Sequence, residues 1–241
     1  MAKSHAKSRG SLRGQRALAV RVRTAKGRRS SSTRWLARQL NDPYVKQARQ
    51  EGYRSRSAFK LLELNQRVRF LLPGARVVDL GSVPGGWSQV AAIMTNSTGD
   101  QDGKARGSVY AFDIAAMEDV EGVAFTRLDL HSADAIDVAE KFVGGKADVV
   151  LSDMAAASSG HAKTDHLRIV ALCEVAFEVA CALLCEGGTF VCKVLAGGAE
   201  GNLQRELKQR FAKVRTMKPP ASRSDSSEKY LVATGFRSDR G

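Results

Sequence analysis

The stretch of sequence that decides the fold runs from Val77 to Trp87 and reads VVDLGSVPGGW. It joins a short apolar run to a glycine-rich turn at Gly81–Gly86, followed by the start of a helix. Glycine lets the backbone approach a ligand closely, and the first strand–helix turn of a parallel sheet is where nucleotides bind. The glycines are not spaced as G-x-G-x-x-G, which weakens a dinucleotide interpretation. A glycine turn can also be purely structural, so on its own it predicts only a strand–turn–helix unit.

Outward from this turn, short apolar strands alternate with helices. The predicted strands are Ala75–Leu80, Ser108–Phe112, Ala124–Leu128, Asp148–Leu151, Thr189–Val194, Lys213–Met217 and Tyr230–Thr234. The predicted helices between them are Gly86–Met94, Ala133–Phe142, Asp165–Leu184 (ended by Gly187-Gly188) and Glu200–Arg210. This alternation predicts an α/β fold whose mostly parallel sheet has helices on both faces. Because no helix separates the last two strands, we expect the final strand to run antiparallel.

The N-terminal part has a different composition. Residues 1–31 are rich in Arg, Lys, Ser and Gly, so we expect a disordered basic tail before a domain at 32–241. Three helices are predicted to open that domain, within about 32–72. The first is capped by Ser32 or Thr33 and runs through Leu40, the second starts at Asp42-Pro43 and stops before Gly52, and the third runs from Ser57 to Val68.

Positive charge is concentrated in the tail. The formal net charge is +13, and residues 1–30 hold ten Lys and Arg and no acid, so 13 − 10 = +3 remains for the rest. Such a block suits a polyanion through counterion release, although it could equally be a solvated tail. We expect RNA contacts from the tail and the first two helices, through Arg34, Arg38, Lys46, Arg49, Arg54 and Arg56.

The cellular location is predicted from the absence of membrane-spanning and secretory segments in the sequence. No run approaches 18 consecutive apolar residues and no secretory signal opens the chain, so we expect no membrane association and a cytoplasmic location. The Arg- and Ser-rich, acid-free start is also typical of mitochondrial transit peptides, which leaves that location as an alternative. The four cysteines, Cys173, Cys181, Cys185 and Cys192, lack C-x-x-C spacing and indicate reduced core residues without zinc.

Acids follow three predicted strands. Asp113 ends the strand that begins at Ser108, where a carboxylate can accept hydrogen bonds from ribose hydroxyls. Asp129 follows the next apolar stretch, where it could contact an adenine amino group. Asp153 follows the strand that ends at Leu151. Acids repeated along one edge of a sheet are poorly explained as solvated surface, so a nucleoside-bearing ligand is the better interpretation.

A lysine inside an apolar strand adds chemistry to this edge. Lys193 lies within TFVCKVL, and burying a charge is costly unless the charge is paired. A snorkelling edge residue or a structural ion pair would also explain it. Glu228 directly precedes the last strand, so an antiparallel direction would bring Asp153, Lys193 and Glu228 together. Periodicity alone makes Lys60 an ordinary surface lysine.

Several motifs together resemble the FtsJ-type methyltransferases. They are YRSRSAFKL at 53–61, DLGSVPGGW at 79–87, SDMA at 152–155, Lys193, and the segment from KP at 218–219 to SEKY at 227–230. The likeness covers about residues 31–236. It implies a Rossmann-like class I methyltransferase fold with a seven-stranded sheet, S-adenosyl-L-methionine as methyl donor, and no metal.

The resemblance also implies roles for individual residues. The family's Lys-Asp-Lys-Glu tetrad maps to Lys60, Asp153, Lys193 and Glu228, with Lys193 as general base, and its cofactor contacts map to Gly85, Trp87, Asp113, Asp129 and Asp153. Burial, Lys60 and the donor's sulfonium charge favour a neutral Lys193, whereas Asp153 and Glu228 oppose it. Alternatively, the hydroxyl loses its proton late and the tetrad mainly orients it.

Within the family, the chain most resembles bacterial members that methylate a uridine ribose 2′-hydroxyl in 23S rRNA. That likeness implies the large ribosomal subunit as partner and a monomeric enzyme. Two departures, Ser82-Val83 in place of two alanines and Ala156-Ala157 in place of Pro-Asn, concern the loops around the site. Alternatives are a transfer-RNA or messenger-cap 2′-O-methyltransferase, a non-catalytic assembly factor, and a nicotinamide-dependent oxidoreductase. The intact tetrad disfavours the second, and the glycine spacing disfavours the third.

Overall fold

The computed structural model describes residues 30–156, 160–195 and 200–238. The chain divides into two units, residues 1–52 and residues 53–241. The predicted disordered tail lies outside the described residues, apart from its last two positions, Ser30 and Ser31, which open the first helix.

The described part of the first unit consists of two helices, α1 (Ser30–Asn41) and α2 (Pro43–Gln50). Asp42 separates them and caps α2, because its side chain accepts a hydrogen bond of 3.0 Å from the backbone N–H of Tyr44. Pro43 occupies the first turn, where its missing N–H has no cost. Both helices were predicted, and α1 begins two residues before the expected cap.

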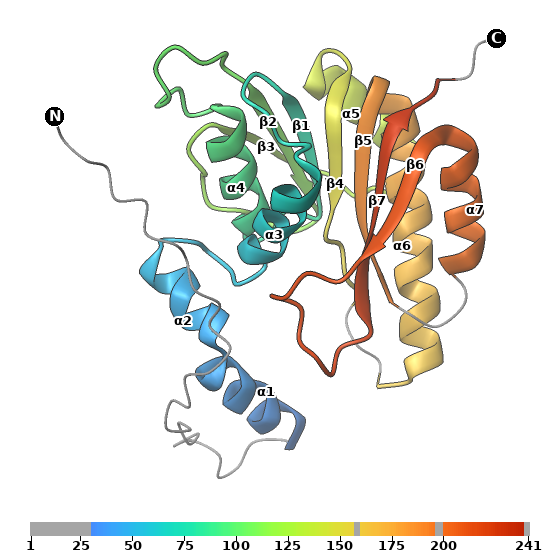
Figure 1. Cartoon of the computed structure of the whole chain (residues 1–241). Coiled ribbons are helices and arrows are strands. Elements are labelled where there is room, and N and C mark those ends of the chain that lie inside the picture. Colours follow the sequence, from blue (N-terminus) through green and yellow to red (C-terminus); the bar gives the residue numbers. More distant parts are fainter. Residues whose placement is uncertain (1–29, 157–159, 196–199, 239–241) are drawn as a thin grey trace, which may run out of the picture. The chain divides into compact units, whose positions relative to one another are not determined.

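The second unit is built on a seven-stranded sheet flanked by helices (Figure 1). Its strands are β1 (Arg76–Leu80), β2 (Ser108–Asp113), β3 (Val123–Arg127), β4 (Ala147–Ser152), β5 (Leu184–Leu195), β6 (Phe211–Met217) and β7 (Glu228–Phe236). Its helices are α3 (Ala58–Val68), α4 (Gly86–Thr95), α5 (Ala135–Val143), α6 (Ala162–Leu183) and α7 (Glu200–Arg210). Each predicted strand and helix is confirmed, with bounds that differ by a few residues.

The strand order is β3-β2-β1-β4-β5-β7-β6. Strands β1 to β5 pair in parallel, and β7 runs antiparallel to both of its neighbours. The prediction of a mostly parallel sheet with an antiparallel last strand is therefore confirmed. The chain turns from β1 towards β2 on one side and returns to β4 on the other. Ligands of open α/β sheets bind at such a reversal, beyond the carboxyl ends of the strands.

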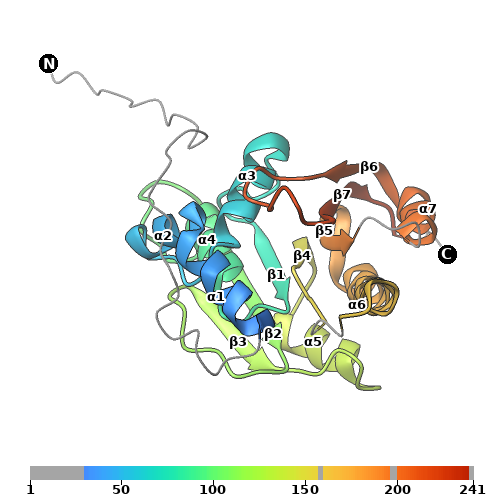
Figure 2. The ribbon, with the colours of Figure 1, turned by 90° about the horizontal axis from the view of Figure 1, so that it is seen from below.

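Helices cover both faces of the sheet, with α3 and α4 on one face and α5, α6 and α7 on the other (Figure 2). The strands feed both layers because successive side chains point to opposite faces. Val77 and Val149 pack with α3 and α4, whereas their neighbours Val78 and Val150 pack with the other three helices. Because both faces of these strands are buried, their sequences are continuous apolar runs and do not alternate with polar residues.

The predicted role of one glycine pair is wrong. The helix predicted to end at Leu184 ends at Leu183, but Gly187 and Gly188, which were expected to end it, lie inside β5, which begins at Leu184 and not at Thr189. The pairing with β4 is irregular there, because five residues of β5, 184 to 188, pass while β4 advances by two. Gly187 has φ of +81°, a conformation that favours glycine. The glycines thus shape an irregular strand start and not a helix end.

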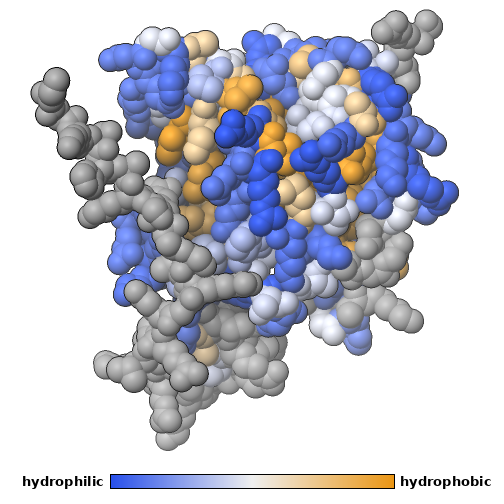
Figure 3. Space-filling model, in the orientation of Figure 1, coloured by the Kyte–Doolittle hydropathy of each residue, from blue (hydrophilic) through white to orange (hydrophobic). Residues whose placement is uncertain are grey.

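The side of the molecule drawn in Figure 3 is mainly hydrophilic. Its hydrophobic side chains are interspersed with hydrophilic ones and form no continuous hydrophobic face. Large hydrophobic residues that are well exposed include Ile114 and Leu167. Among the described residues, no helix combines the length and the apolar character needed to cross a membrane.

A carboxyl group is buried in the sheet itself. Asp79 of β1 has no exposed surface, and the Ser88 hydroxyl donates a 2.6 Å hydrogen bond to its Oδ2. Burial raises the pKa of Asp79 to about 7, the Ser88 hydrogen bond lowers it in part, and the nearby charges of Asp153 and Asp113 raise it further. In the unfolded chain this group would ionise near its ordinary value of 3.8. Because the unfolded chain ionises at Asp79 more readily than the folded protein, the free energy of unfolding falls as the pH rises from about 4 to about 7.

We predict that Asp79→Asn, which mimics the neutral acid, removes this pH-dependent loss of stability. The advantage of the variant in free energy of unfolding should grow by about 2–3 kcal/mol between pH 5 and pH 8. Urea unfolding of both proteins at the two pH values measures it. Asp137→Asn, at an exposed acid of α5, is the matched control and should show no such growth. Parallel pH profiles for wild type and Asp79→Asn would contradict the assignment.

Candidate active site

The loop after β1 is shaped by glycines at positions that disfavour a side chain. Gly81 has φ of +74°, and a side chain there would overlap Met154, whose Cα lies 3.2 Å from the Cβ position. Gly85 caps α4 with φ of +106°. A Cβ on Gly86 would collide with the Ser55 hydroxyl. The glycine turn is therefore required for a close approach between the loop, β4 and the segment before α3.

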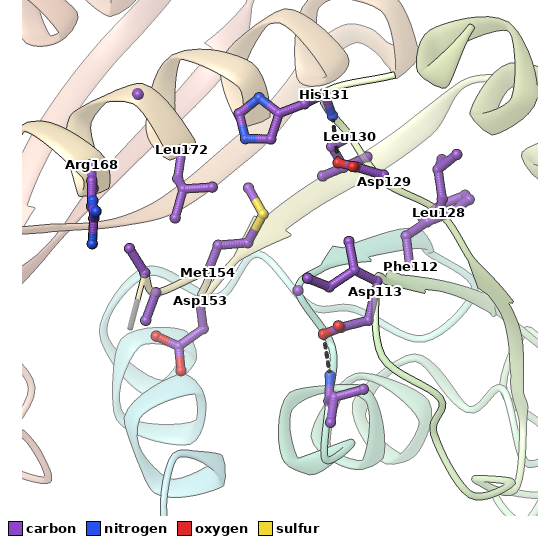
Figure 4. Close-up of a pocket in the computed structure, with 16 residues that line it drawn as sticks. Phe112, Asp113, Leu128, Asp129, Leu130, His131, Asp153, Met154, Arg168 and Leu172 are labelled. Carbon is purple, nitrogen blue, oxygen red and sulfur yellow. Dashed lines mark hydrogen bonds between the residues drawn. The ribbon is translucent and has the colours of Figure 1, made fainter. Parts of the chain in front are cut away.

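A cavity of about 700 Å³ opens at the reversal of strand order (Figure 4). Its walls come from the loop after β1, the carboxyl ends of β2, β3 and β4, and α6. Three carboxylates line it, those of Asp113, Asp129 and Asp153. The structure thus brings together the three acids that follow predicted strands.

Asp113 and Asp129 hold neighbouring backbone and still face the cavity. The two carboxylate oxygens of Asp113 accept hydrogen bonds of 2.9 Å from the amides of Val83 and Ala115. Asp129 Oδ1 accepts a 3.0 Å bond from the amide of His131. A carboxylate has about four acceptor positions, so both acids keep capacity for ligand hydroxyl or amino groups.

Gly85 and Trp87, also expected at the cofactor, are not among the residues that line the cavity. Trp87 is buried, its indole N–H donates a 2.9 Å bond to the Ser57 carbonyl, and its ring lies 5.6 Å from that of Tyr230. Gly85 therefore caps α4, and Trp87 packs in the core beside the loop, so neither contributes to the cavity wall.

Lys193 and Asp153 form a largely buried pair, with side chains 9% and 16% exposed. Lys193 Nζ lies 3.1 Å from Asp153 Oδ1 and donates a 2.6 Å bond to the Asp153 carbonyl. Burial by itself would raise the pKa of Asp153, but the charges of Lys193 and Lys60, together with hydrogen bonds from Tyr230 and Lys193, place the pKa below its ordinary value. The predicted meeting of these two side chains is confirmed.

Lys60 and Glu228 form a second pair at the same edge. Lys60 Nζ lies 2.8 Å from both carboxylate oxygens of Glu228, and the two side chains are 12% and 15% exposed. The Ser222 hydroxyl donates a further 2.8 Å bond to Glu228. The interpretation of Lys60 as an ordinary surface lysine is therefore wrong. Helical spacing shows only which way a side chain leaves its helix, and β7 and its preceding loop cover that side.

Tyr230 links the two pairs, and the sequence analysis did not single it out. Its hydroxyl donates a 2.8 Å bond to Asp153 Oδ1, and Lys60 Nζ lies 5.8 Å from the centre of its ring. Burial, followed by the charges of Asp153 and Glu228, raises the pKa of Tyr230 well above its ordinary value. Tyr230 pairs with Lys193 across β5 and β7. That register, once the last strand is taken as antiparallel, is the signal that could have found it.

The segment before α3 fixes the loop that carries Ser222. Arg56 donates to the carbonyl of Ala221, whose amide donates a 2.7 Å bond to Glu63. Arg54 donates a 2.6 Å bond to the carbonyl of Glu118. Both arginines were expected to face RNA. Both instead have backbone partners within the second unit, residues 53–241, which we call the sheet unit.

The residues fit a cationic, nucleoside-bearing methyl donor. Asp79 Oδ1 in β1 and Ser82 Oγ in the loop after β1 are buried, and within the described part of the chain neither forms a hydrogen bond. Buried polar atoms normally have partners, so an ordered water is suited to them. Neither residue lines the cavity itself. S-adenosylmethionine carries hydroxyl and amino donors and a sulfonium charge. The three carboxylates of the cavity match both properties.

Comparison with known proteins agrees with this geometry. The family model of FtsJ-like methyltransferases matches residues 53–236. The ribosomal RNA large subunit methyltransferase E of Roseobacter denitrificans is 62% identical over 98% of this chain and 99% of its own length. The protein of the same name from Ruegeria pomeroyi is 61% identical over 93% of this chain and 97% of its own length.

A solved structure is also similar. A ribosomal RNA methyltransferase from Plasmodium falciparum superimposes with a TM-score of 0.67 at 29% identity, over 76% of this chain and 98% of that one. Because the family model spans nearly the whole sheet unit, and the bacterial relatives are similar almost from end to end, the chain belongs to the FtsJ-like methyltransferase family.

Proposed function

We propose that this methyltransferase transfers a methyl group from S-adenosyl-L-methionine to the ribose 2′-hydroxyl of a uridine in 23S rRNA of the large ribosomal subunit. The observation that carries the proposal is the pairing of Lys193 with Asp153 and of Lys60 with Glu228 beside an acid-lined cavity. The names of the bacterial relatives support the substrate class. A ribosomal substrate would place the enzyme in the cytoplasm.

The donor would lie along the carboxyl ends of β1 to β4. Asp113 would accept hydrogen bonds from its ribose hydroxyls, and Asp129 would contact its adenine amino group. The loop after β1, supported by Gly85 and Trp87, would hold the amino-acid end. When bound, the donor supplies a sulfonium methyl group that is already activated. The protein then has to align the acceptor oxygen and remove one proton.

The contacts of Lys193 support its assignment as general base. Within the described residues, Asp153 supplies both of its hydrogen-bond partners, the carbonyl and one carboxylate oxygen. An amine nitrogen has three positions besides its bond to carbon, so one remains for the acceptor hydroxyl. Lys193 would take the hydroxyl proton there, and the ammonium formed would be stabilised by Asp153. Lys60 and Glu228 would orient the same ribose.

The tail and the N-terminal helices would supply affinity for RNA. The ten lysines and arginines of residues 1–30 suit the phosphate backbone, which is bound without much regard to sequence. Lys46 and Arg49 are exposed on α2. Specificity for one uridine would then come from the sheet unit and from the shape of the ribosomal RNA.

The substrate assignment is tested by incubating the full chain with S-adenosylmethionine and three RNA substrates. These are large ribosomal subunits, free 23S rRNA and transfer RNA, all from cells that lack the corresponding gene. Mass spectrometry of digested RNA should show a new 2′-O-methyluridine in the ribosomal samples only. Methylation of transfer RNA alone would favour the alternative substrate class.

We predict that Lys193→Ala and Lys193→Arg both lower the rate of methyl transfer by about 10²–10⁴-fold, the range for loss of a general base. Affinity for S-adenosylmethionine, measured by calorimetry, should stay near that of the wild type. Lys193→Arg keeps the positive charge beside Asp153, so it separates loss of the base from loss of the ion pair. Lys213→Ala, at an exposed lysine of β6, is the control. Near-normal turnover of Lys193→Arg would end the general-base proposal.

Asp113→Asn should weaken binding of S-adenosylmethionine about tenfold or more, because hydrogen bonds to a charged acceptor are replaced by weaker ones. The variant keeps an oxygen that can accept from one of the two backbone amides. Calorimetric titration of the donor measures the effect, with Asp137→Asn as the matched exposed control. Unchanged donor affinity would show that Asp113 only holds its own loop.

Removal of residues 1–29 should weaken binding to 23S rRNA and flatten its dependence on salt, because fewer phosphate charges are neutralised. Filter binding at several salt concentrations gives the slope of log Kd against log salt. Donor affinity serves as the internal control, since the cavity lies wholly within the sheet unit. A truncated protein with the same slope would show that the tail does not contact the RNA.

A further inference from the structure

One basic side chain of the cavity has no role in the chemistry described above. Arg168 leaves α6 to line the wall, and it is exposed. It is the one lysine or arginine among the residues that line the cavity, where three carboxylates also lie. Its guanidinium nevertheless forms no hydrogen bond or ion pair with any described residue.

An exposed arginine that lines the cavity and stays unpaired is available for a ligand. Its planar guanidinium presents five N–H donors in a fork that matches the geometry of an oxyanion. No acid of the cavity wall uses this fork, although a bidentate pair with one of them would be stabilising. The free fork therefore indicates an anion that arrives with the substrates.

The position of Arg168 indicates which substrate carries that anion. Figure 4 shows Arg168 on the same side of the cavity as Asp153, whereas Asp113 and Asp129 lie on the other side. Asp153 bonds to Lys193, so this is the side at which the acceptor ribose is proposed to lie. The adenosine of the donor belongs to the opposite side.

The chemistry of RNA supplies the anion. A ribose whose 2′-hydroxyl meets Lys193 carries a phosphodiester on the adjacent O3′. The residues that line the cavity also include Ala155 and Ala156, which have small side chains. The donor also has a carboxylate, but its amino-acid end is expected at the loop after β1, which lines the cavity with Gly81 and Val83.

We propose that Arg168 binds the phosphate next to the ribose that is methylated, and so positions the acceptor and not the donor. The inference rests on the proposed function, because it assumes an RNA acceptor at Lys193. Arg168 would hold the target nucleotide so that its 2′-hydroxyl lies at Lys193, while the tail binds distant phosphates.

The test uses the full chain with Arg168→Ala and Arg168→Lys, and large ribosomal subunits from cells lacking the corresponding gene. We expect Arg168→Ala to raise KM for the subunits about tenfold, and Arg168→Lys to raise it less, because lysine keeps the charge but not the fork. The calorimetric Kd for S-adenosylmethionine should not change. The salt slope for binding 23S rRNA should fall by about 0.7–0.9, as expected for one lost phosphate contact.

Arg215→Ala is the matched control, since it removes one exposed arginine from β6, the edge strand farthest in the sheet order from β1 to β3. It should leave KM near the wild-type value. A weaker donor Kd with unchanged KM for RNA would assign Arg168 to the donor carboxylate and overturn the inference. Wild-type values for both constants would overturn it as well. A wild-type enzyme that fails to methylate the subunits would instead overturn the proposed function itself.

Discussion

The burial of Lys193 in an apolar strand is the constraint on which the site depends. Desolvating an ammonium group costs several kcal/mol unless a partner compensates, and that partner is Asp153, which directly follows β4. The parallel pairing of β4 and β5 is what brings Asp153 within reach. The antiparallel insertion of β7 then closes the other side with Tyr230 and Glu228. An all-parallel sheet would carry those two side chains to the opposite edge.

The charges of the site fall into two groups. Two lysines meet two carboxylates in pairs, so the part of the site proposed for the acceptor is close to neutral. Asp113 and Asp129 add negative charge to the part of the cavity proposed for the donor, and a sulfonium compound would offset it. Asp79 is fully buried in β1, and this burial raises its pKa, with smaller contributions from the charges of Asp153 and Asp113. A cation bound in the cavity would oppose that shift, so binding of a cationic donor and ionisation of Asp79 would be linked.

The sequence predicted most of this arrangement because strand ends are regular. An acid that directly follows an apolar strand must lie at the carboxyl end of that strand. Lys193 was recognisable as a charge that needed a partner. Lys60 was not recognisable from spacing, because its neighbour Glu228 comes from the other end of the chain. Tyr230 was hidden for the same reason, since an apolar strand position gives no sign that a hydroxyl is used. The glycine pair in β5 misled because glycine ends helices more often than it bends strands.

Asp153 belongs both to the cavity and to the paired side chains beside it. Its carboxylate lines the cavity proposed for the donor, pairs with Lys193 and accepts a hydrogen bond from the Tyr230 hydroxyl. The carboxylate that makes burial of Lys193 tolerable is thus also part of the cavity wall. A substitution of Asp153 would therefore disturb the cavity and the ion pair together, whereas a substitution of Asp113 or Asp129 would act on the cavity alone.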